Sequence, residues 1–196
     1  MLYLIIIFGS MLVITTINTI LLPAPTAAEF GRIMLSTLLG TLSVIAWDGI
    51  LALLIRRCPL WKRYFTPDNA VFKVSKRERS FYRRIGIQNW KYSIPEFGLF
   101  SGFSKGDFIR QGDTSYLGQC LTESHYGVAI HLSNALLGFL IIFLPWCATP
   151  TIAVPIALVN MILSLLPMAV LRFNTLPLLG SYRREQLSIL KKTPSR

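Results

Sequence analysis

Residues 35–57 read LSTLLGTLSVIAWDGILALLIRR, an apolar stretch that ends in two arginines. From about Leu35 to Ile55 it is long enough to cross a hydrocarbon core of roughly 30 Å as an α-helix. Further apolar stretches of this kind occupy about residues 1–22, 131–146 and 152–171. The sequence therefore predicts an all-α integral membrane protein with four transmembrane helices.

The first apolar stretch has a competing interpretation as a cleaved signal peptide, because Thr26-Ala27-Ala28 resembles a cleavage site. A signal peptide carries basic residues ahead of its apolar part. Here the apolar run starts at Met1 with no basic residue before it. We favour a transmembrane helix that Pro23-Ala24-Pro25 ends.

The basic residues predict the orientation of the four spans. All but one of the 20 Lys and Arg residues lie in segments 56–130 and 172–196, and the exception is Arg32. Lys and Arg accumulate on the cytoplasmic side of a membrane protein. We therefore expect a multi-pass protein of the cell membrane, with both termini and segment 56–130 in the cytoplasm. The spans then form two hairpins within a single membrane domain, 1–196, which ends in a cytoplasmic tail, 172–196.

Segment 56–130 interleaves aromatic and basic residues, a composition that suits a folded layer at the depth of the lipid head groups. Within it, residues Lys76–Asn89 are predicted to form an amphipathic helix with Phe81 and Ile85 on one face. Residues Pro95–Gly112 contain four glycines and predict irregular backbone. Asp113-Thr114 is a favourable helix start, and we expect that helix to continue into the third span.

The net charge of +11 has two readings. In a soluble protein it would favour nucleic acid, but no nucleic-acid-binding motif accompanies it, so nucleic acid is not expected as a partner. Basic residues beside apolar spans favour membrane lipids with anionic head groups. Cys58, Cys120 and Cys147 are widely spaced. They indicate neither a zinc site nor a disulfide framework, and no metal or bound cofactor is expected.

Both histidines lie close to Glu123, at positions 125 and 131. On a helix, Glu123 and His131 are two turns apart and separated by about 80° in projection, whereas His125 lies nearly opposite Glu123. A histidine can take a proton from an attacking hydroxyl, and a carboxylate can orient it or stabilise its charged form. The competing interpretation is a helix end at the membrane interface, whose polar residues meet lipid head groups.

Asp48 is the acid inside a predicted span, where a carboxylate is costly and usually has a partner. Arg172, at the cytoplasmic end of the fourth span, is a candidate for that partner. A structural pair, or a protonated and hydrogen-bonded aspartic acid, is the favoured interpretation. Asn134 and Asn160 are expected to make hydrogen bonds between helices. The sequence has no G-x-S-x-G, P-loop or G-x-G-x-x-G motif, which leaves the soluble hydrolase and nucleotide-binding classes unsupported.

An ordered set of short motifs, over roughly residues 70–180, resembles the glycosyl-4,4'-diaponeurosporenoate acyltransferase family of small membrane proteins. The chain differs at Val128, where the family has a second Glu, and at Thr175-Leu176-Pro177, where the family has arginines. We do not carry the carotenoid substrate over. The motifs are Phe81-Tyr82, Trp90-Lys91-x-x-x-Pro95-x-x-Gly98, Glu123 with His131, and Pro167 followed by Arg172-Phe173-Asn174.

The resemblance implies an acyltransferase that moves a fatty acyl group onto a hydroxyl of a lipid or glycolipid at the cytoplasmic boundary. It implies His131 as general base, with Glu123 as its orienting carboxylate. Acyl-CoA, acyl carrier protein and phospholipid all remain open as the donor. Trp90 and Lys91 would form the site floor or bind a phosphate-bearing donor, Arg172 and Asn174 would bind a carboxylate or oxyanion, and Asp48 is a further substrate-binding candidate.

Two other functions remain open. The first is a non-enzymatic protein that binds anionic lipid, or a larger membrane-protein partner, through the basic aromatic layer. The second is a small transporter, which needs polar residues deep in several spans.

Overall fold

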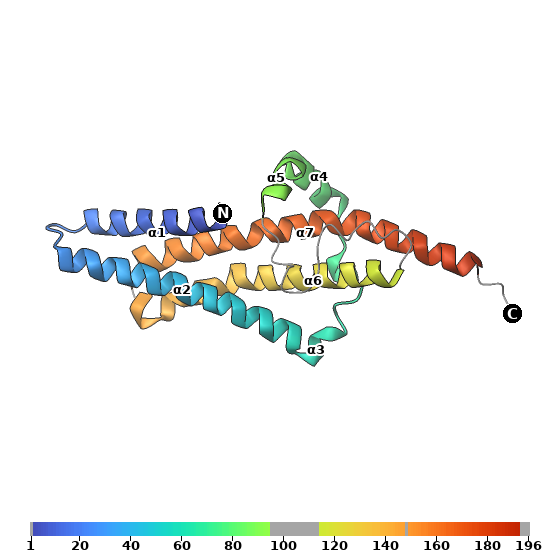
Figure 1. The fold of residues 1–196 in the computed structure, drawn as a ribbon, viewed down its shortest axis with the longest axis horizontal. Coiled ribbons are helices and arrows are strands. Elements are labelled where there is room, and N and C mark those ends of the chain that lie inside the picture. Colours follow the sequence, from blue (N-terminus) through green and yellow to red (C-terminus); the bar gives the residue numbers. More distant parts are fainter. Residues whose placement is uncertain (1, 95–113, 148, 193–196) are drawn as a thin grey trace. The chain divides into compact units, whose positions relative to one another are not determined.

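The computed structural model describes residues 2–94, 114–147 and 149–192, and these form helices and turns without a strand. The predicted irregular backbone of Pro95–Gly112 lies outside the described residues. Figure 1 shows the order of the elements along the chain. They are α1 Leu2–Ile20, α2 Ala27–Arg57, α3 Pro59–Lys62, η1 Ala70–Phe72, α4 Lys76–Arg84, α5 Ile87–Trp90, η2 Lys91–Ser93, α6 Thr114–Leu137, η5 Gly138–Phe143, η6 Pro145–Cys147 and α7 Pro150–Lys192.

Four helical stretches are long and apolar enough to cross a membrane, which confirms the predicted number of spans. They are Tyr3–Ile20, Ala27–Arg57, Thr114–Phe143 and Pro150–Lys191. The last three extend beyond the predicted apolar stretches, because a helix does not have to stop where the hydrocarbon ends. The helix expected from Thr114 does continue into the third span. The arrangement in two hairpins, the cytoplasmic layer and the orientation stay predictions.

The chain divides into two compact units. Unit 1 comprises Met1–Arg57 with Ile130–Leu166, and unit 2 comprises Cys58–Ala129 with Pro167–Arg196. Helices α6 and α7 each contribute to both units, since the divisions fall inside them. The predicted spans α1 and α2 therefore belong to unit 1, and most of the predicted interfacial segment belongs to unit 2.

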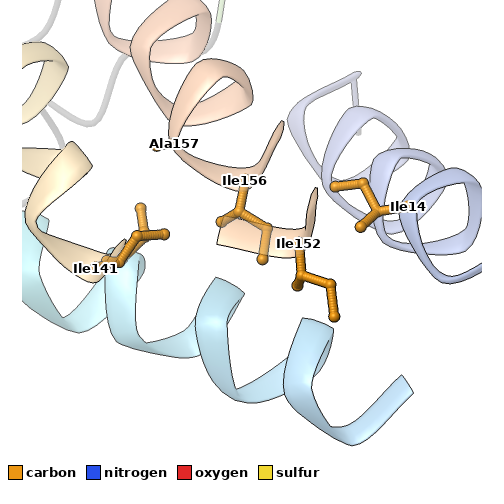
Figure 2. Close-up of a cluster of buried hydrophobic side chains, with 6 residues drawn as sticks. Ile14, Ile141, Ile152, Ile156 and Ala157 are labelled. Atoms are coloured by element: carbon orange, nitrogen blue, oxygen red, sulfur yellow. The ribbon is translucent and has the colours of Figure 1, made fainter. Parts of the chain in front are cut away.

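An isoleucine-rich cluster forms the core of unit 1. The cluster joins α1, α2, η5 and α7, and Figure 2 shows its isoleucine side chains gathered beside α2. Polar contacts fix α1 to α7 as well: the Asn18 amide donates to the Thr151 carbonyl at 3.1 Å, and the Tyr3 hydroxyl donates to the Leu163 carbonyl at 3.1 Å. The buried members of the cluster are Ile14, Val44, Ile141, Ile152, Ile156 and Ala157.

Gly40 lets α2 pack closely against its neighbours in unit 1. A Cβ atom at this position would lie 2.6 Å from Cys147 Sγ and 2.9 Å from Ile156 Cδ1. Trp146 also donates from its indole N–H to Ser43 Oγ at 3.0 Å, one turn along α2. The absence of a side chain at Gly40 is therefore a packing requirement.

Helices α6 and α7 pack against each other in unit 2 as antiparallel neighbours. A Cβ atom at Gly118 would lie 3.4 Å from Tyr182, and one at Gly127 would lie 2.6 Å from Leu171. As residue numbers rise along α6, the contacting residue numbers on α7 fall. Cys120 and Leu121 of α6 are fully buried in a cluster with Leu178. These contacts hold the part of α7 that carries Arg172 and Asn174.

The amphipathic helix predicted over Lys76–Asn89 is wrong in its extent. Helix α4 ends at Arg84, and α5 begins at Ile87. The cause is Gly86, whose φ of 66° is the left-handed conformation that ends a helix. The face of α4 that carries Phe81 is exposed: Phe81 is 56% exposed, whereas its neighbour Tyr82 is buried.

Candidate functional site

A charged pair joins α4 to α7 within unit 2. The Arg172 guanidinium donates from Nε to Glu78 Oε1 at 2.5 Å and from Nη2 to Glu78 Oε2 at 2.7 Å. Nη2 also donates to the Lys73 carbonyl at 3.3 Å. The side chains of Arg172 and Glu78 are only 16% and 23% exposed. A bidentate pair with this burial is a strong and directional contact.

Glu78 owes its position to the start of α4. Ser75 precedes the helix, and its hydroxyl accepts the backbone N–H of Glu78 at 3.1 Å. This cap satisfies a backbone donor that the first turn of a helix leaves open. The carboxylate of Glu78 is thereby directed towards α7 from a fixed helix end.

Tyr82 completes a hydrogen-bonded chain with Glu78 and Arg172. Its hydroxyl donates to Glu78 Oε1 at 2.8 Å, one turn along α4. Hydrogen bonding to Arg172 holds the pKa of Glu78 below its usual range. Burial, together with the Glu78 carboxylate, raises the pKa of Tyr82 to about 12. At neutral pH these three hydrogen-bonded side chains are therefore a neutral phenol, an ionised carboxylate and a positively charged guanidinium.

The expectation that Arg172 pairs with Asp48 is wrong. Arg172 pairs with Glu78, whereas Asp48 Oδ1 accepts a hydrogen bond from the Asn160 amide at 3.4 Å in unit 1. The same amide nitrogen donates to the backbone carbonyl of Asn134 at 3.2 Å. This confirms that Asn160 makes hydrogen bonds between helices, and it agrees with the structural interpretation of Asp48. Within unit 2, the Glu78 carboxylate meets Arg172 in bidentate geometry.

An open groove in unit 2 brings Lys91 and Asn174 together. Its volume is about 330 Å³. These two residues come from motifs that are more than 80 residues apart in the sequence, the Trp-Lys segment and the Arg-Phe-Asn segment. The other residues that line the groove are Tyr92, Leu117, Pro177, Leu178 and Ser181.

Lys91 places its ammonium group beside two aromatic rings. Nζ lies 4.9 Å from the ring centroid of Tyr92 and 5.6 Å from that of Phe173. A cation at these distances is attracted by the negative face of the ring. The contact with Phe173 links η2 directly to α7 and fixes the charged end of Lys91 near the groove.

Trp90 has a different role in this region. Its indole N–H donates to the Ile85 carbonyl at 3.1 Å, which bridges the break between α4 and α5. The polar group of Trp90 is thus used within the fold. Pro95 and Gly98, which complete its motif, lie outside the described residues.

Glu123 and His131 lie on one unbroken helix, α6, with Gly127 midway between them. Positions four residues apart share a helix face. That face meets α7 at Gly127, where it contacts Leu171. Glu123 is half-buried in unit 2, and His131 is half-buried in unit 1. Whether the two side chains act together stays a prediction.

The two histidines have unlike surroundings. His125 is 1% exposed, its Nδ1 lies 3.0 Å from the Thr66 carbonyl, and its ring stacks on Phe72 at 4.2 Å between centroids. A carbonyl accepts only from a protonated nitrogen, so this contact requires the hydrogen on Nδ1. His131 makes no hydrogen bond within the part of the chain that the structure describes. His125 therefore has structural contacts, whereas no hydrogen bond within the described residues occupies the imidazole of His131.

Sequence reasoning did not identify Glu78, Tyr92 or Ser181 as site residues. A signal for Glu78 was present, because it is the single acid among six basic residues between 73 and 84 and stands three residues after Ser75. Tyr92 and Ser181 carried no comparable signal, since only the fold brings them to Lys91. Within the described residues, no group of three or more His, Cys, Asp and Glu side chains is placed to hold a metal ion.

The fold and the site define a protein with four membrane-compatible helices, and with an open groove and a largely buried ion pair in unit 2. The family model described as glycosyl-4,4'-diaponeurosporenoate acyltransferase matches residues 62–180, more than half of the chain. The chain belongs to this family, which confirms the resemblance found in its motifs. No curated protein and no solved structure matches the chain.

Proposed function

We propose that the protein transfers a fatty acyl group from an activated donor to a hydroxyl of a lipid or glycolipid at the cytoplasmic boundary of the membrane. One observation carries the proposal beyond the family description. Motif segments that are distant in the sequence meet in unit 2, through the Tyr82–Glu78–Arg172 chain and the groove shared by Lys91 and Asn174.

The reaction requires a group that removes a proton from the acceptor hydroxyl. In our proposal His131 accepts this proton while the hydroxyl oxygen attacks the acyl carbonyl carbon of an ester or thioester donor. A new C–O bond forms, the bond from the carbonyl carbon to the leaving oxygen or sulfur breaks, and the proton passes from His131 to the leaving group. The role is supported by the imidazole of His131, which makes no hydrogen bond to the residues that the structure describes.

Glu123 is proposed to stabilise the charged form of His131. The support is the continuity of α6, because an unbroken helix preserves the angular spacing that the sequence predicts. Eight residues of α-helix rise about 12 Å, so the substrate or a chain of several water molecules would have to connect the two groups.

The remaining candidate residues divide into binding and positioning roles. Lys91 and Asn174 are proposed to contact substrate, because both line the groove. Arg172 and Trp90 are proposed to position α4, α5 and η2, because their polar groups bind Glu78 and the Ile85 carbonyl. Asp48 keeps its hydrogen bond to Asn160 and is proposed to support the helices of unit 1.

Lipid mass spectrometry of membranes tests this proposal. Membranes that contain the wild-type chain should show an acylated lipid that is absent without the chain and absent with His131→Ala. The Lys62→Met variant is a matched control, since Lys62 is exposed and does not line the groove. No new acylated species with the wild-type chain, or the same species with His131→Ala, would contradict the proposed catalytic role.

A second function, a non-enzymatic partner that binds anionic lipid, is favoured by α4. Its basic residues are all exposed, and Phe81 is exposed among them. The one acid of α4 is engaged by Arg172. This function predicts that neutralising Arg83 and Arg84 abolishes lipid-dependent activity in cells, whereas His131→Ala has no effect. The basic residues are Lys76, Arg77, Arg79, Arg83 and Arg84.

A further inference from the structure

The groove of unit 2 combines hydrogen-bonding groups with an apolar floor. Lys91 and Asn174 lie at one part of its lining, and Pro177 and Leu178 follow along α7. Asn174 and Ser181 are two helical turns apart, about 10 Å along the axis. A groove with this pattern suits an elongated amphiphile. Its volume of about 330 Å³ is at the small end of the range for ligand sites.

The charge of the groove is positive. Lys91 is the charged residue among those that line it, and no acid does so within the described residues. A second cation borders the groove, because Arg184 Nη2 lies 3.4 Å from Ser181 Oγ. An anionic ligand in the groove therefore has Lys91 in its lining and Arg184 at its border, and no acid is among the described lining residues.

The cations at the groove can bind a phosphate. Arg172 is not available for this, because it uses its planar pair of donors on Glu78. Arg184 at the border carries the same planar donors, which suit phosphate as well as carboxylate. Lys91 instead presents a compact point charge, which is a common way of binding phosphate. Its aromatic neighbours hold the ammonium near the groove without neutralising it. Asn174 and Ser181 can donate hydrogen bonds to further oxygens.

We infer that this groove binds the phosphate-bearing part of an acyl donor, with the phosphate at Lys91 and Asn174 and apolar atoms against Leu117 and Leu178. The inference rests on the proposed function, which needs an activated donor but does not identify it. Acyl-CoA and phospholipid share the required chemistry, since each carries an ester-linked phosphate and an acyl chain.

Equilibrium binding tests the inference without turnover. The full-length chain is purified in uncharged detergent, and the probe is radiolabelled dodecyl phosphate. A neutral amphiphile of similar length, dodecanoyl glycerol, serves as the reference probe. Lys91→Met should weaken the binding of dodecyl phosphate about tenfold or more, because a charge-assisted contact is lost. Lys91→Arg should retain most of it, and Lys62→Met should behave as wild type.

The outcomes separate this inference from the proposed function. Equal loss of both probes in Lys91→Met, or unchanged binding of dodecyl phosphate, would overturn the groove assignment even in an active transferase. Selective loss of dodecyl phosphate would support it even if no acyl transfer were found. Displacement of the probe by palmitoyl-CoA, and not by phosphatidylglycerol, would identify the thioester as donor; the reverse result would identify the phospholipid.

Discussion

Breaking the Glu78–Arg172 pair should release α4 from α7. The substitution Glu78→Gln keeps the shape of the side chain but removes its charge, and it turns one accepting oxygen into an amide donor that faces Arg172. At least one charge-assisted hydrogen bond is lost, from a pair that is only 16% and 23% exposed. Such bonds contribute about 1.5–3 kcal/mol each. We expect a loss of about 2 kcal/mol in the free energy that holds α4 closed, or about thirtyfold in its local opening equilibrium.

Amide hydrogen exchange of residues 76–84 measures this opening in the purified protein. A double-mutant cycle with Glu78→Gln and Arg172→Gln isolates the coupling between the two side chains. The exposed pair of Asp68 and Arg183 is a matched control, because it also joins segment 58–94 to α7 within unit 2 but is 53% and 52% exposed at 3.4 Å. We expect the control coupling to be below about 1 kcal/mol. Equal coupling for the two pairs would refute the reasoning.

The same pair predicts a pH dependence. Hydrogen bonding to Arg172 lowers the pKa of Glu78 in the folded state. A carboxyl with a lowered pKa stabilises the fold above its unfolded-state pKa, and this contribution is lost as the pH falls through the folded-state value. Exchange of α4 should therefore accelerate at acidic pH in the wild type, and this acceleration should be absent in Glu78→Gln. A pH response that persists in Glu78→Gln would assign the effect to another group.

Two further predictions concern packing and the histidines. Gly40→Val should destabilise unit 1 by about 1–3 kcal/mol, because the valine side chain would overlap Cys147. Gly49→Val on the same helix is the control, because its side chain meets open space. Thermal unfolding in detergent compares the two variants, and an equal loss of stability would contradict the packing argument. His125→Ala should lower the unfolding temperature, since it removes a buried ring and its hydrogen bond, whereas His131→Ala should abolish acyl transfer with little change in that temperature.

The number of spans could be predicted from the sequence because long apolar stretches identify themselves without reference to any partner. The extent of α4 was predicted wrongly because the periodicity of Phe81 and Ile85 suggested a longer helix. A single glycine at position 86 adopts the left-handed conformation and ends that pattern. Local patterns therefore identified the elements but not their ends.

The site was less predictable because its contacts join residues far apart in the sequence. Lys91 and Asn174 were found through the family resemblance, and the fold brings them to one groove. The partner of Arg172 was missed, because Asp48 was the more conspicuous acid and Glu78 stood among basic residues. The contact between Glu78 and Arg172 joins residues 94 positions apart, and spacing along the chain does not encode such a contact.

The most direct test of the central claim is acyl transfer by the purified chain in nanodiscs, followed by mass spectrometry with an isotopically labelled acyl donor. Palmitoyl-CoA and phosphatidylglycerol are supplied in separate reactions, together with a lipid extract as the source of hydroxyl acceptors. The account predicts labelled acyl ester in the lipid fraction with the wild type and with Lys62→Met, and none with His131→Ala. Label that stays on the donor in every reaction, or that transfers equally well with His131→Ala, would contradict it.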